Sequence, residues 1–269
     1  MKIVSWNING IRSNIICDGS MKKSIKYLKE FGECNLKILI DKYDPDIICF
    51  QETRCNDKIG SIFQFPEYPY KYWHYSKGEG ARGCNRYSGT SIWSKVKPIS
   101  YDNEFPEEEG RYMRMIFDDF DLINVYTPNS GTNFEYRIDT WDKHIKKLLS
   151  NTDKCLVFTG DLNVVNDYID IWNPVYLKNA KMPSCLIEER QNFKEYLKMG
   201  YLDIFRELHP DKKKYSWWNM RTKARVSNRG WRIDYFLGHN KFKDRFEECD
   251  ILTDIIGSDH CPIILKLKL

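Results

Sequence analysis

Short runs with the two-residue period of β-strands recur along the chain and are bounded by turn residues. They lie at residues 2–8, 45–51, 89–95, 111–117, 121–126, 154–160, 231–237 and 261–267. Longer segments with helical spacing lie at 24–42, 135–149 and 188–199, and Gly200 after the last one is a C-cap signal. Some strands follow one another directly and others are separated by helices. The pattern therefore favours an α/β sandwich of two mixed sheets with helices outside over strict βαβ alternation.

Domain organisation follows from what the pattern lacks. No linker rich in proline, glycine or serine interrupts the chain, and no internal repeat divides it. Its 269 residues are enough for two small domains or one large domain. We therefore expect a single domain over residues 1–269.

Polar clusters stand at the ends of several predicted strands. They are WNING at 6–10, QET at 51–53, YTPNSG at 126–131, GDLN at 160–163, RID at 232–234 and SDH at 258–260. Each cluster alone suits an ordinary turn, since Asp, Asn and Gly favour turns. Six clusters that share carboxylates, amides and one imidazole indicate instead a site on one rim of the sandwich.

Composition restricts the cellular setting more than the function. The net charge of +4 permits a polyanionic partner without requiring one. Nine cysteines occur without C-x-x-C spacing, which argues against a zinc ribbon and against a disulfide framework. The N-terminus does not resemble a secretory leader, and nowhere do about 18 apolar residues follow one another. We expect a soluble intracellular protein with no membrane partner, in the nucleus or cytoplasm or, for a viral protein, in a viral factory or virion.

The polar clusters supply an oxygen-rich set of side chains. The set consists of Glu52, Asp161, Asp234, Asp259, Asn7, Asn9, Asn129, Asn163, Tyr126 and His260. Oxygen ligands without thiolates or several histidines favour a hard cation, so we expect Mg²⁺ or Mn²⁺ rather than zinc. Glu52 with Asp259 or Asn9 could hold such an ion.

The remaining polar residues suit the hydrolysis of a phosphate ester. A carboxylate such as Asp234 beside His260 would fix the tautomer of the imidazole and raise its pKa. A charged His260 could bind a phosphoryl oxygen and stabilise the charge that grows on it during attack. Asp161, polarised by Asn163, could orient or deprotonate a water molecule. These residues predict metal-assisted phosphodiester hydrolysis, and a purely structural origin of the polar rim is the main alternative.

Nine motifs resemble those of the exonuclease III family of abasic-site (AP) endonucleases, within the DNase I-like endonuclease/exonuclease/phosphatase superfamily. They are KIVSWNINGIRS, FQETR, EEGRYM, NVYTPNSG, EYRIDTWD, FTGDLNVV, ERQNF, NRGWRIDYFL and GSDHCPI, in the order of the family. The resemblance implies a four-layer α/β sandwich and a Mg²⁺-dependent enzyme that cuts duplex DNA 5′ to an abasic site. It also implies some 3′-5′ exonuclease or 3′-phosphodiesterase activity, and we expect the protein to act as a monomer.

The resemblance also assigns roles by position. Glu52 is similar to the principal metal ligand of the family, and Asn9, Asp259, Asp161 and Asn163 correspond to residues around the ion. Asp161 further resembles the group that activates water, and Asn163 its partner in positioning the phosphate. The couple that contacts the scissile phosphate corresponds to Asp234 and His260. Other phosphate-contacting and transition-state residues correspond to Tyr126, Asn7 and Asn129.

The stretch 215–236 bears on the substrate, because it interleaves three tryptophans with Arg221, Lys223, Arg225, Arg229 and Arg232. This combination suits a displaced nucleotide and its flanking phosphates, although each tryptophan taken alone could equally fill the core. By resemblance, Trp217, Trp231 and Ile233 line a pocket that admits an extruded abasic sugar and rejects a normal nucleotide. Further DNA contacts are expected from Arg221, Tyr87 and Arg12, and from Arg82 and Arg86 in the loop 76–88.

Two other classes of function stay open. The wider fold includes inositol-phosphate phosphatases, deadenylases and sphingomyelinases, so a related phosphodiesterase or phosphatase acting on RNA or a small phosphorylated molecule is the alternative enzyme. A catalytically inactive nucleic-acid-binding module is the third hypothesis. The presence of a complete set of candidate catalytic side chains argues against it.

Overall fold

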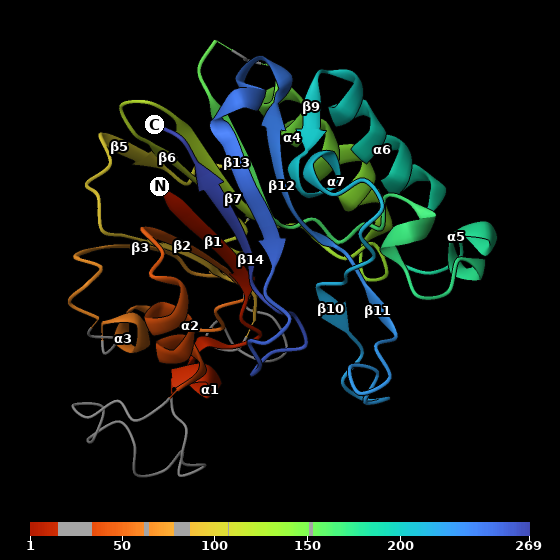
Figure 1. Ribbon diagram of the computed structural model, residues 1–269, viewed down its shortest axis with the longest axis horizontal. Coiled ribbons are helices and arrows are strands. Elements are labelled where there is room, and N and C mark those ends of the chain that lie inside the picture. Colours follow the sequence, from red (N-terminus) through yellow and green to blue (C-terminus); the bar gives the residue numbers. More distant parts are fainter. Residues whose placement is uncertain (16–33, 62–64, 78–86, 107, 151–152) are drawn as a thin grey trace.

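The computed structural model describes residues 1–15, 34–61, 65–77, 87–106, 108–150 and 153–269. Its strands form two six-stranded sheets that pack face to face (Figure 1). The first sheet has the order β13 (Phe246–Ile251), β14 (Ile263–Leu267), β1 (Lys2–Asn7), β2 (Ile47–Gln51), β4 (Thr90–Ser94) and β3 (Tyr70–His74). The second has the order β5 (Ser100–Asp102), β6 (Tyr112–Ile116), β7 (Asp121–Tyr126), β8 (Leu156–Asp161), β12 (Asp234–His239) and β9 (Tyr201–Asp203). A separate ribbon pairs β10 (Trp217–Trp218) with β11 (Gly230–Trp231).

Strand direction explains why the polar clusters meet at one rim. β1 runs parallel to β2, and β7 runs parallel to β8, so the C-terminal ends within each pair lie at one edge of their sheet. β14 is antiparallel to β1 and β12 is antiparallel to β8, so these two strands begin where the others end. Polar residues that follow four strands and precede two others therefore gather at the same rim.

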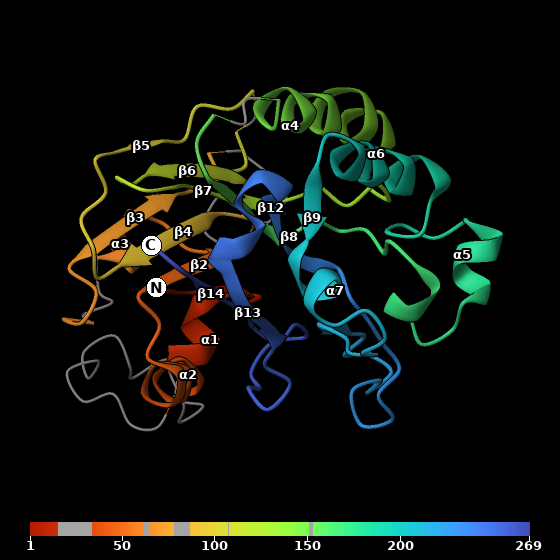
Figure 2. The same ribbon diagram turned by 45° about the horizontal axis from the view of Figure 1, so that its top comes forward.

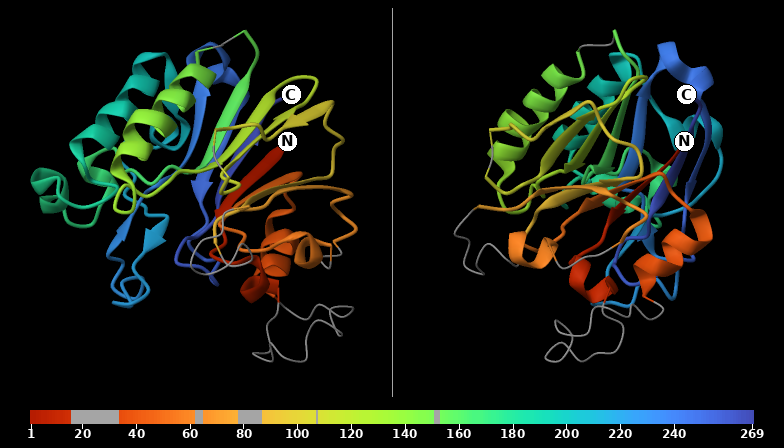
Figure 3. Two further views of the ribbon diagram at one scale, coloured as in Figure 1. Left: turned by 180° about the vertical axis from the view of Figure 1, so that it is seen from behind. Right: turned by 90° about the vertical axis from the view of Figure 1, so that its left-hand side faces the viewer.

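Helices cover the outer faces of both sheets, which gives the four predicted layers (Figures 2 and 3). α1 (Ile11–Ile15), α2 (Asn35–Tyr43) and α3 (Asp57–Gly60) lie outside the first sheet. The π-helix η3 (Tyr136–Trp141), α4 (Asp142–Leu148) and α6 (Ile187–Lys198) lie outside the second. The other described helices are η4 (Tyr168–Asp170), α5 (Val175–Asn179), α7 (Ile204–Leu208) and η5 (Asn240–Arg245). The four-layer α/β sandwich expected from the sequence is confirmed.

The predicted helices agree with the structure where it describes them. The segment 135–149 forms η3 and α4, and 188–199 forms α6, after which Gly200 has a φ of +96° and ends the helix. Only the end of the segment 24–42 is described, and it lies in α2. Arg82 and Arg86 of the predicted DNA-contacting loop lie outside the described residues. No helix that the structure describes combines the length and the apolar character needed to cross a bilayer.

Apolar side chains from both sheets fill the space between them. Ile3 and Cys49 of the first sheet belong to the same buried cluster as Leu122 and Val157 of the second. Two further clusters pack the helices onto the outer faces, for example through Leu39 of α2. The seven described cysteines are buried free thiols, as their apolar surroundings in the sequence predict.

The predicted strand 231–237 is divided in two by the packing of its side chains. β11 ends at Trp231 and β12 begins at Asp234, and Arg232 between them is completely buried. The Arg232 guanidinium binds the carboxylates of Asp170 and Asp203. Arg232 therefore points inward, between η4 and β9. Its neighbours Trp231 and Ile233 line the site described below, and the strand is interrupted between Trp231 and Asp234.

Gly160 allows β8 to approach β7 closely just before Asp161. Its φ is +140°, and a Cβ atom there would lie 1.9 Å from the backbone oxygen of Val125. We expect Gly160→Ala to lower the free energy of unfolding by more than about 1 kcal/mol, since both backbone strain and the clash oppose the substitution. Urea unfolding checks this, and a variant within about 0.5 kcal/mol of the wild type would contradict the close approach.

Candidate functional site

A pocket of about 300 Å³ lies at the rim where the strand ends meet. The predicted site residues that line it are Asn7, Glu52, Tyr126, Asn129, Asp161, Asn163, Trp217, Trp231, Ile233, Asp259 and His260. Residues from both sheets and from the β10–β11 ribbon therefore contribute to one cavity. Asn9 and Asp234 join the same site through hydrogen bonds to lining residues.

Asp161 stands at the end of β8 on the floor of this pocket. The side chain of Asn7 donates to its Oδ2 at 2.9 Å, and the backbone N–H of Asn163 donates to its Oδ1 at 2.9 Å. Asn163 has a φ of +47°, a conformation that asparagine tolerates better than most residues, and its amide donates to the carbonyl of Thr127. Asn129 donates in turn to the amide oxygen of Asn163 at 3.3 Å. The carboxylate is thus held from both sheets.

His260 lies between two buried carboxylates. Its Nδ1 is 2.8 Å from Oδ2 of Asp234, and its Nε2 is 3.7 Å from Oδ2 of Asp161. Ser216 donates to the same Asp234 oxygen at 2.6 Å and accepts the backbone N–H of Asp234. The predicted orientation of His260 by Asp234 is therefore present in the structure, and Nε2 points toward the group expected to handle water.

Burial and neighbouring charge have opposite effects on the pKa of each member of this pair, and on balance both pKa values are raised. Burial would lower the pKa of His260, but the carboxylates of Asp234 and Asp161 outweigh it and raise the pKa to about 10. Burial raises the pKa of Asp161 to about 7, although His260 partly opposes this effect. At neutral pH His260 is therefore charged, and Asp161 lies near the range in which a carboxylate can accept a proton readily.

Glu52 and Asp259 also line the pocket, and Asn9 is joined to Asp259 by a hydrogen bond. Asn9 donates its amide N–H to Oδ1 of Asp259 at 2.6 Å, and Trp217 donates Nε1–H to the other oxygen at 3.1 Å. Arg54 binds a single oxygen of Glu52, Oε1. Glu52 and Asn9 both adopt positive φ, so the backbone at these two strand ends is in a conformation found more often at functional positions than in regular structure.

Two groups of side chains at the site could hold a metal ion. The ligand atoms of Asp161, Asp234 and His260 lie within 4.8 Å of one another. A protonated imidazole has no lone pair for a metal, however, and the surroundings of His260 favour that form. Carboxylate and amide oxygens of Glu52, Asp259 and Asn9 suit a hard cation better, so the donor chemistry fits the expected ion.

Arg111 is a site residue that the strand-end pattern did not reveal. It is buried beneath Tyr126, with its guanidinium carbon 4.4 Å from the ring centroid. It donates to the backbone oxygen of Tyr126 and to the hydroxyl of Tyr87. Burial and the nearby Glu52 hold the pKa of Tyr126 well above its usual value, so the phenol stays protonated as a donor. Tyr87, which was expected to contact DNA, binds Arg111 through its hydroxyl and is not among the residues that line the pocket. DNA contact by Tyr87 stays a prediction.

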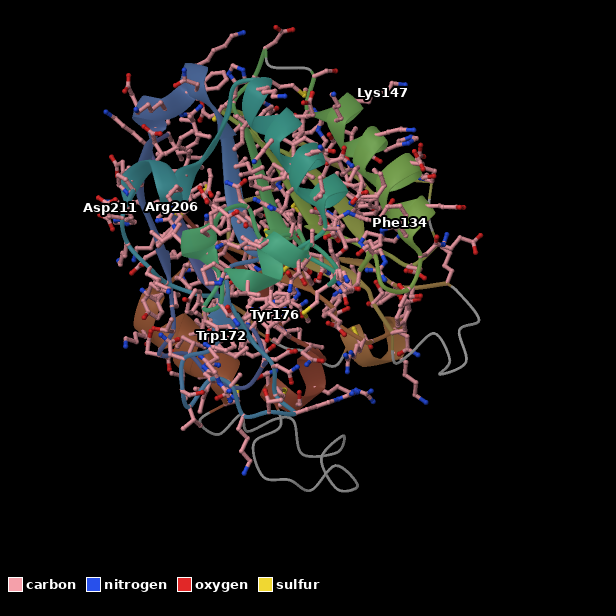
Figure 4. All side chains as sticks on the ribbon, turned by 90° about the vertical axis from the view of Figure 1, so that its right-hand side faces the viewer. Phe134, Lys147, Trp172, Tyr176, Arg206 and Asp211 are labelled. Carbon is pink, nitrogen blue, oxygen red and sulfur yellow. The ribbon has the colours of Figure 1, made fainter. Side chains whose placement is uncertain are left out.

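Aromatic and apolar side chains form the wall of the pocket. The rings of Trp217 and Trp231 lie 5.1 Å apart, and Tyr176 packs against the far side of Trp231. Figure 4 shows Tyr176, a residue of α5, next to Trp172, so a second aromatic layer supports this wall. Met182, Pro183 and Ser184 also line the pocket. These three residues follow no predicted strand, so only tertiary structure could reveal them.

The basic residues of the stretch 215–236 have different surroundings. Arg221 is exposed in the loop between β10 and β11, outside the pocket. Arg225 donates to backbone carbonyls and stacks at 4.6 Å on Trp218, which fills core. The interpretation of Arg232 as a phosphate-contacting residue is wrong, because two carboxylates bind it in the interior. Arg12 lies on α1 and does not line the pocket, and DNA contact by Arg12 and Arg221 stays a prediction.

Comparison with known proteins agrees with this geometry. The model of the endonuclease/exonuclease/phosphatase family matches residues 4–260. An exodeoxyribonuclease of Bacillus subtilis is 36% identical over 281 residues, which cover 100% of both chains. The DNA repair nuclease APEX1 of Danio rerio is 36% identical over 279 residues, which cover 99% of this chain and 82% of its own. The structure of the AP endonuclease LMAP from Leishmania major aligns with a TM-score of 0.83 at 25% identity, over 100% of this chain and 87% of that one. The chain belongs to the endonuclease/exonuclease/phosphatase family.

Proposed function

We propose that the chain is a Mg²⁺-dependent DNA repair nuclease that hydrolyses the phosphodiester 5′ to an abasic site in duplex DNA. The observation that carries the proposal is the convergence of Asp161 and His260, whose Oδ2 and Nε2 atoms are 3.7 Å apart on the floor of a pocket with apolar walls. The relatives named as an exodeoxyribonuclease and a DNA repair nuclease support the same chemistry. We further propose that the protein acts as a monomer.

The two buried groups divide the hydrolytic step between them. Asp161, with a pKa raised to about 7, orients a water molecule and takes its proton as the water oxygen attacks phosphorus. The new P–O bond forms as the bond to the 3′ oxygen breaks, and that oxygen leaves as an alkoxide, which takes a proton from solvent water and becomes the 3′ hydroxyl. His260 stays protonated because Asp234 lies behind it, and its Nε2–H donates to the phosphoryl oxygen on which charge develops.

Glu52, Asn9 and Asp259 are the residues that we propose to hold Mg²⁺. When bound, the ion supplies positive charge against the phosphate oxygens and the leaving oxygen. The protein supplies the rest of the positioning: Asn7 and Asn163 fix Asp161, and Tyr126 presents a protonated phenol to the same cavity. The metal is thus assigned to the oxygen ligands of Glu52, Asn9 and Asp259, and proton transfer and phosphate binding to Asp161 and His260.

Substrate choice rests on the pocket wall. Trp217, Trp231 and Ile233 offer apolar surfaces against which a sugar without a base can lie. We propose that this wall, which packs on Tyr176 through Trp231, excludes the base of a normal nucleotide. We also propose 3′-5′ exonuclease or 3′-phosphodiesterase activity alongside incision, because the Asp161–His260 pair would act on a phosphate at a 3′ end by the same chemistry and one relative is an exodeoxyribonuclease.

One assay tests the function. The protein is incubated with a duplex that carries a single stable abasic analogue, with Mg²⁺ or with EDTA, beside the undamaged duplex as control. We expect one metal-dependent cut immediately 5′ to the analogue and no comparable cut in the control. Tight binding without incision would favour a binding module. Hydrolysis restricted to RNA or small phosphate esters would favour the alternative enzyme.

A further inference from the structure

Arg137 is a buried cation that lies next to the site without lining its pocket. Its side chain is 3% exposed, and its Nε is 3.0 Å from Oδ1 of Asp142, which is equally buried. Arg137 belongs to the π-helix η3, where the backbone N–H of Asp142 donates to the carbonyl of Arg137. Short π-helical segments are rare and frequently occur at functional sites, because they alter the direction of the side chains that they carry.

The Arg137 guanidinium connects the two loops that carry the candidate phosphate-positioning amides. Its Nη1 donates to the carbonyl of Pro128 at 3.1 Å and to that of Asn163 at 3.4 Å, and its Nη2 donates to the carbonyl of Leu162 at 3.2 Å. Pro128 directly precedes Asn129. One planar group therefore holds the backbone beside Asn129 and the backbone beside Asp161 in a fixed relation.

Asp142 is itself anchored, so the guanidinium has a defined orientation. Asn192 of α6 donates to its Oδ2 at 2.9 Å, and the hydroxyl of Tyr196 lies 3.5 Å from its Oδ1. The chain of contacts runs from α6 through Asp142 and Arg137 to both loops. Its last link is the hydrogen bond between the side chains of Asn129 and Asn163 at 3.3 Å.

Charge balance alone does not account for this arrangement. A salt bridge with Asp142 needs one positive charge, which lysine also supplies, whereas the contacts to three loop carbonyls need the planar fork of arginine. Each of those carbonyls would otherwise be a buried acceptor that needs another donor. The guanidinium thus fixes the distance between the loop that carries Asn129 and the loop that carries Asn163.

We propose that Arg137 is a positioning residue, which sets the distance between Asn129 and the Asp161–Asn163 loop and so aligns the phosphate for attack. This inference rests on the proposed nuclease function. Arg137 touches neither the pocket nor the expected reacting atoms. It acts through the backbone that holds Asn129 and Asn163.

The test compares Arg137→Lys with Leu39→Ala, a destabilising change in α2 outside the other sheet. We expect Arg137→Lys to lower kcat for incision about 10- to 100-fold while KM changes less than about threefold, because misplacement by about 1 Å costs rates of this order. Leu39→Ala should leave kcat near the wild-type value at temperatures where both variants are folded. A wild-type kcat in Arg137→Lys would overturn the proposal, since it would show that position 137 contributes only a positive charge.

A second measurement requires no turnover. In ¹⁵N-edited NMR spectra, Arg137→Lys should shift the side-chain amide signals of Asn129 and Asn163, whereas Leu39→Ala should not. Unchanged amide signals in Arg137→Lys would overturn the inference, whatever the activity of the variant. If the wild type itself fails to incise while the amide signals of Arg137→Lys are shifted, only the proposed nuclease function is contradicted. If Arg137→Lys folds poorly, Asp142→Asn replaces it, because this change removes the charge that orients Arg137 at nearly constant size. We expect the same fall in kcat and the same shifts of the Asn129 and Asn163 side-chain signals, and their absence would overturn the inference.

Discussion

We expect Asp161→Asn and His260→Asn each to lower the rate of abasic-site incision about 10³-fold or more, while binding to the abasic duplex should stay close to that of the wild type. Asparagine keeps the approximate size of Asp161 and can still accept from Asn7, but it cannot take a proton from water. In His260→Asn the donor held by Asp234 is lost, and with it the positive charge beside the phosphate. Single-turnover incision and equilibrium binding in EDTA measure the two quantities separately.

The matched controls carry the same substitutions on the outer surface of the second sheet. Asp139→Asn changes an exposed carboxylate of η3, and His144→Asn changes an exposed imidazole of α4. Both should incise at nearly the wild-type rate. Turnover within about tenfold of the wild type in either site variant would contradict the assigned role of that residue, because a single general base or charged donor normally contributes at least about 10².

Arg232→Met should lower the free energy of unfolding by about 3–5 kcal/mol, the largest effect on stability that we expect. The Arg232 side chain is completely buried and makes four hydrogen bonds to the carboxylates of Asp170 and Asp203. Removal leaves these two carboxylates with only Arg206, which binds Asp170 from a partly exposed position. Urea unfolding measures the loss.

Exposed Arg229 provides the control for this change. Arg229→Met removes a guanidinium from the same segment, where the side chain donates to Ser227 and stacks near Trp172, and should alter the free energy of unfolding by less than about 1 kcal/mol. Equal effects of the two substitutions would show that Arg232 does not neutralise buried charge. In that case its predicted role as a surface phosphate contact would have to be reconsidered.

The effect of Arg232→Met should also depend on pH. Burial would raise the pKa of Asp170, but Arg232 and Arg206 outweigh it and hold the pKa below its usual range. The stabilisation is therefore fully present above the unfolded-state pKa of about 3.9 and is lost as the pH falls through the lower native-state value. The difference between wild type and variant should shrink below about pH 4.

How far the sequence determines the site can be judged from single residues. Asp161, His260 and Glu52 could be predicted because each follows or precedes a strand with a clear two-residue period, and strand direction then brings the ends together. Met182, Pro183 and Ser184 could not, since the segment that carries them has no periodic pattern and reaches the pocket only through tertiary packing.

Arg232 and Arg137 show a second limit. A charged residue in a sequence is most often exposed, so a stretch rich in arginine predicts a basic surface. Asp170 and Asp203, which bind Arg232 in the interior, lie far from it in the chain, and so does Leu162, whose carbonyl binds Arg137. Edge strands such as β3 and β13 were missed for a related reason, because their side chains are only partly buried and alternate weakly.

The neighbouring positions of β1 and β14 have a consequence for synthesis of the protein. The amino group of Met1 donates to the carbonyl of Leu267, and β14 separates β1 from β13. Until the ribosome has synthesised β14, the first sheet therefore lacks an inner strand, and His260 has not yet joined Asp161. The carboxylate–imidazole pair can therefore assemble only after β14 has been synthesised and inserted beside β1.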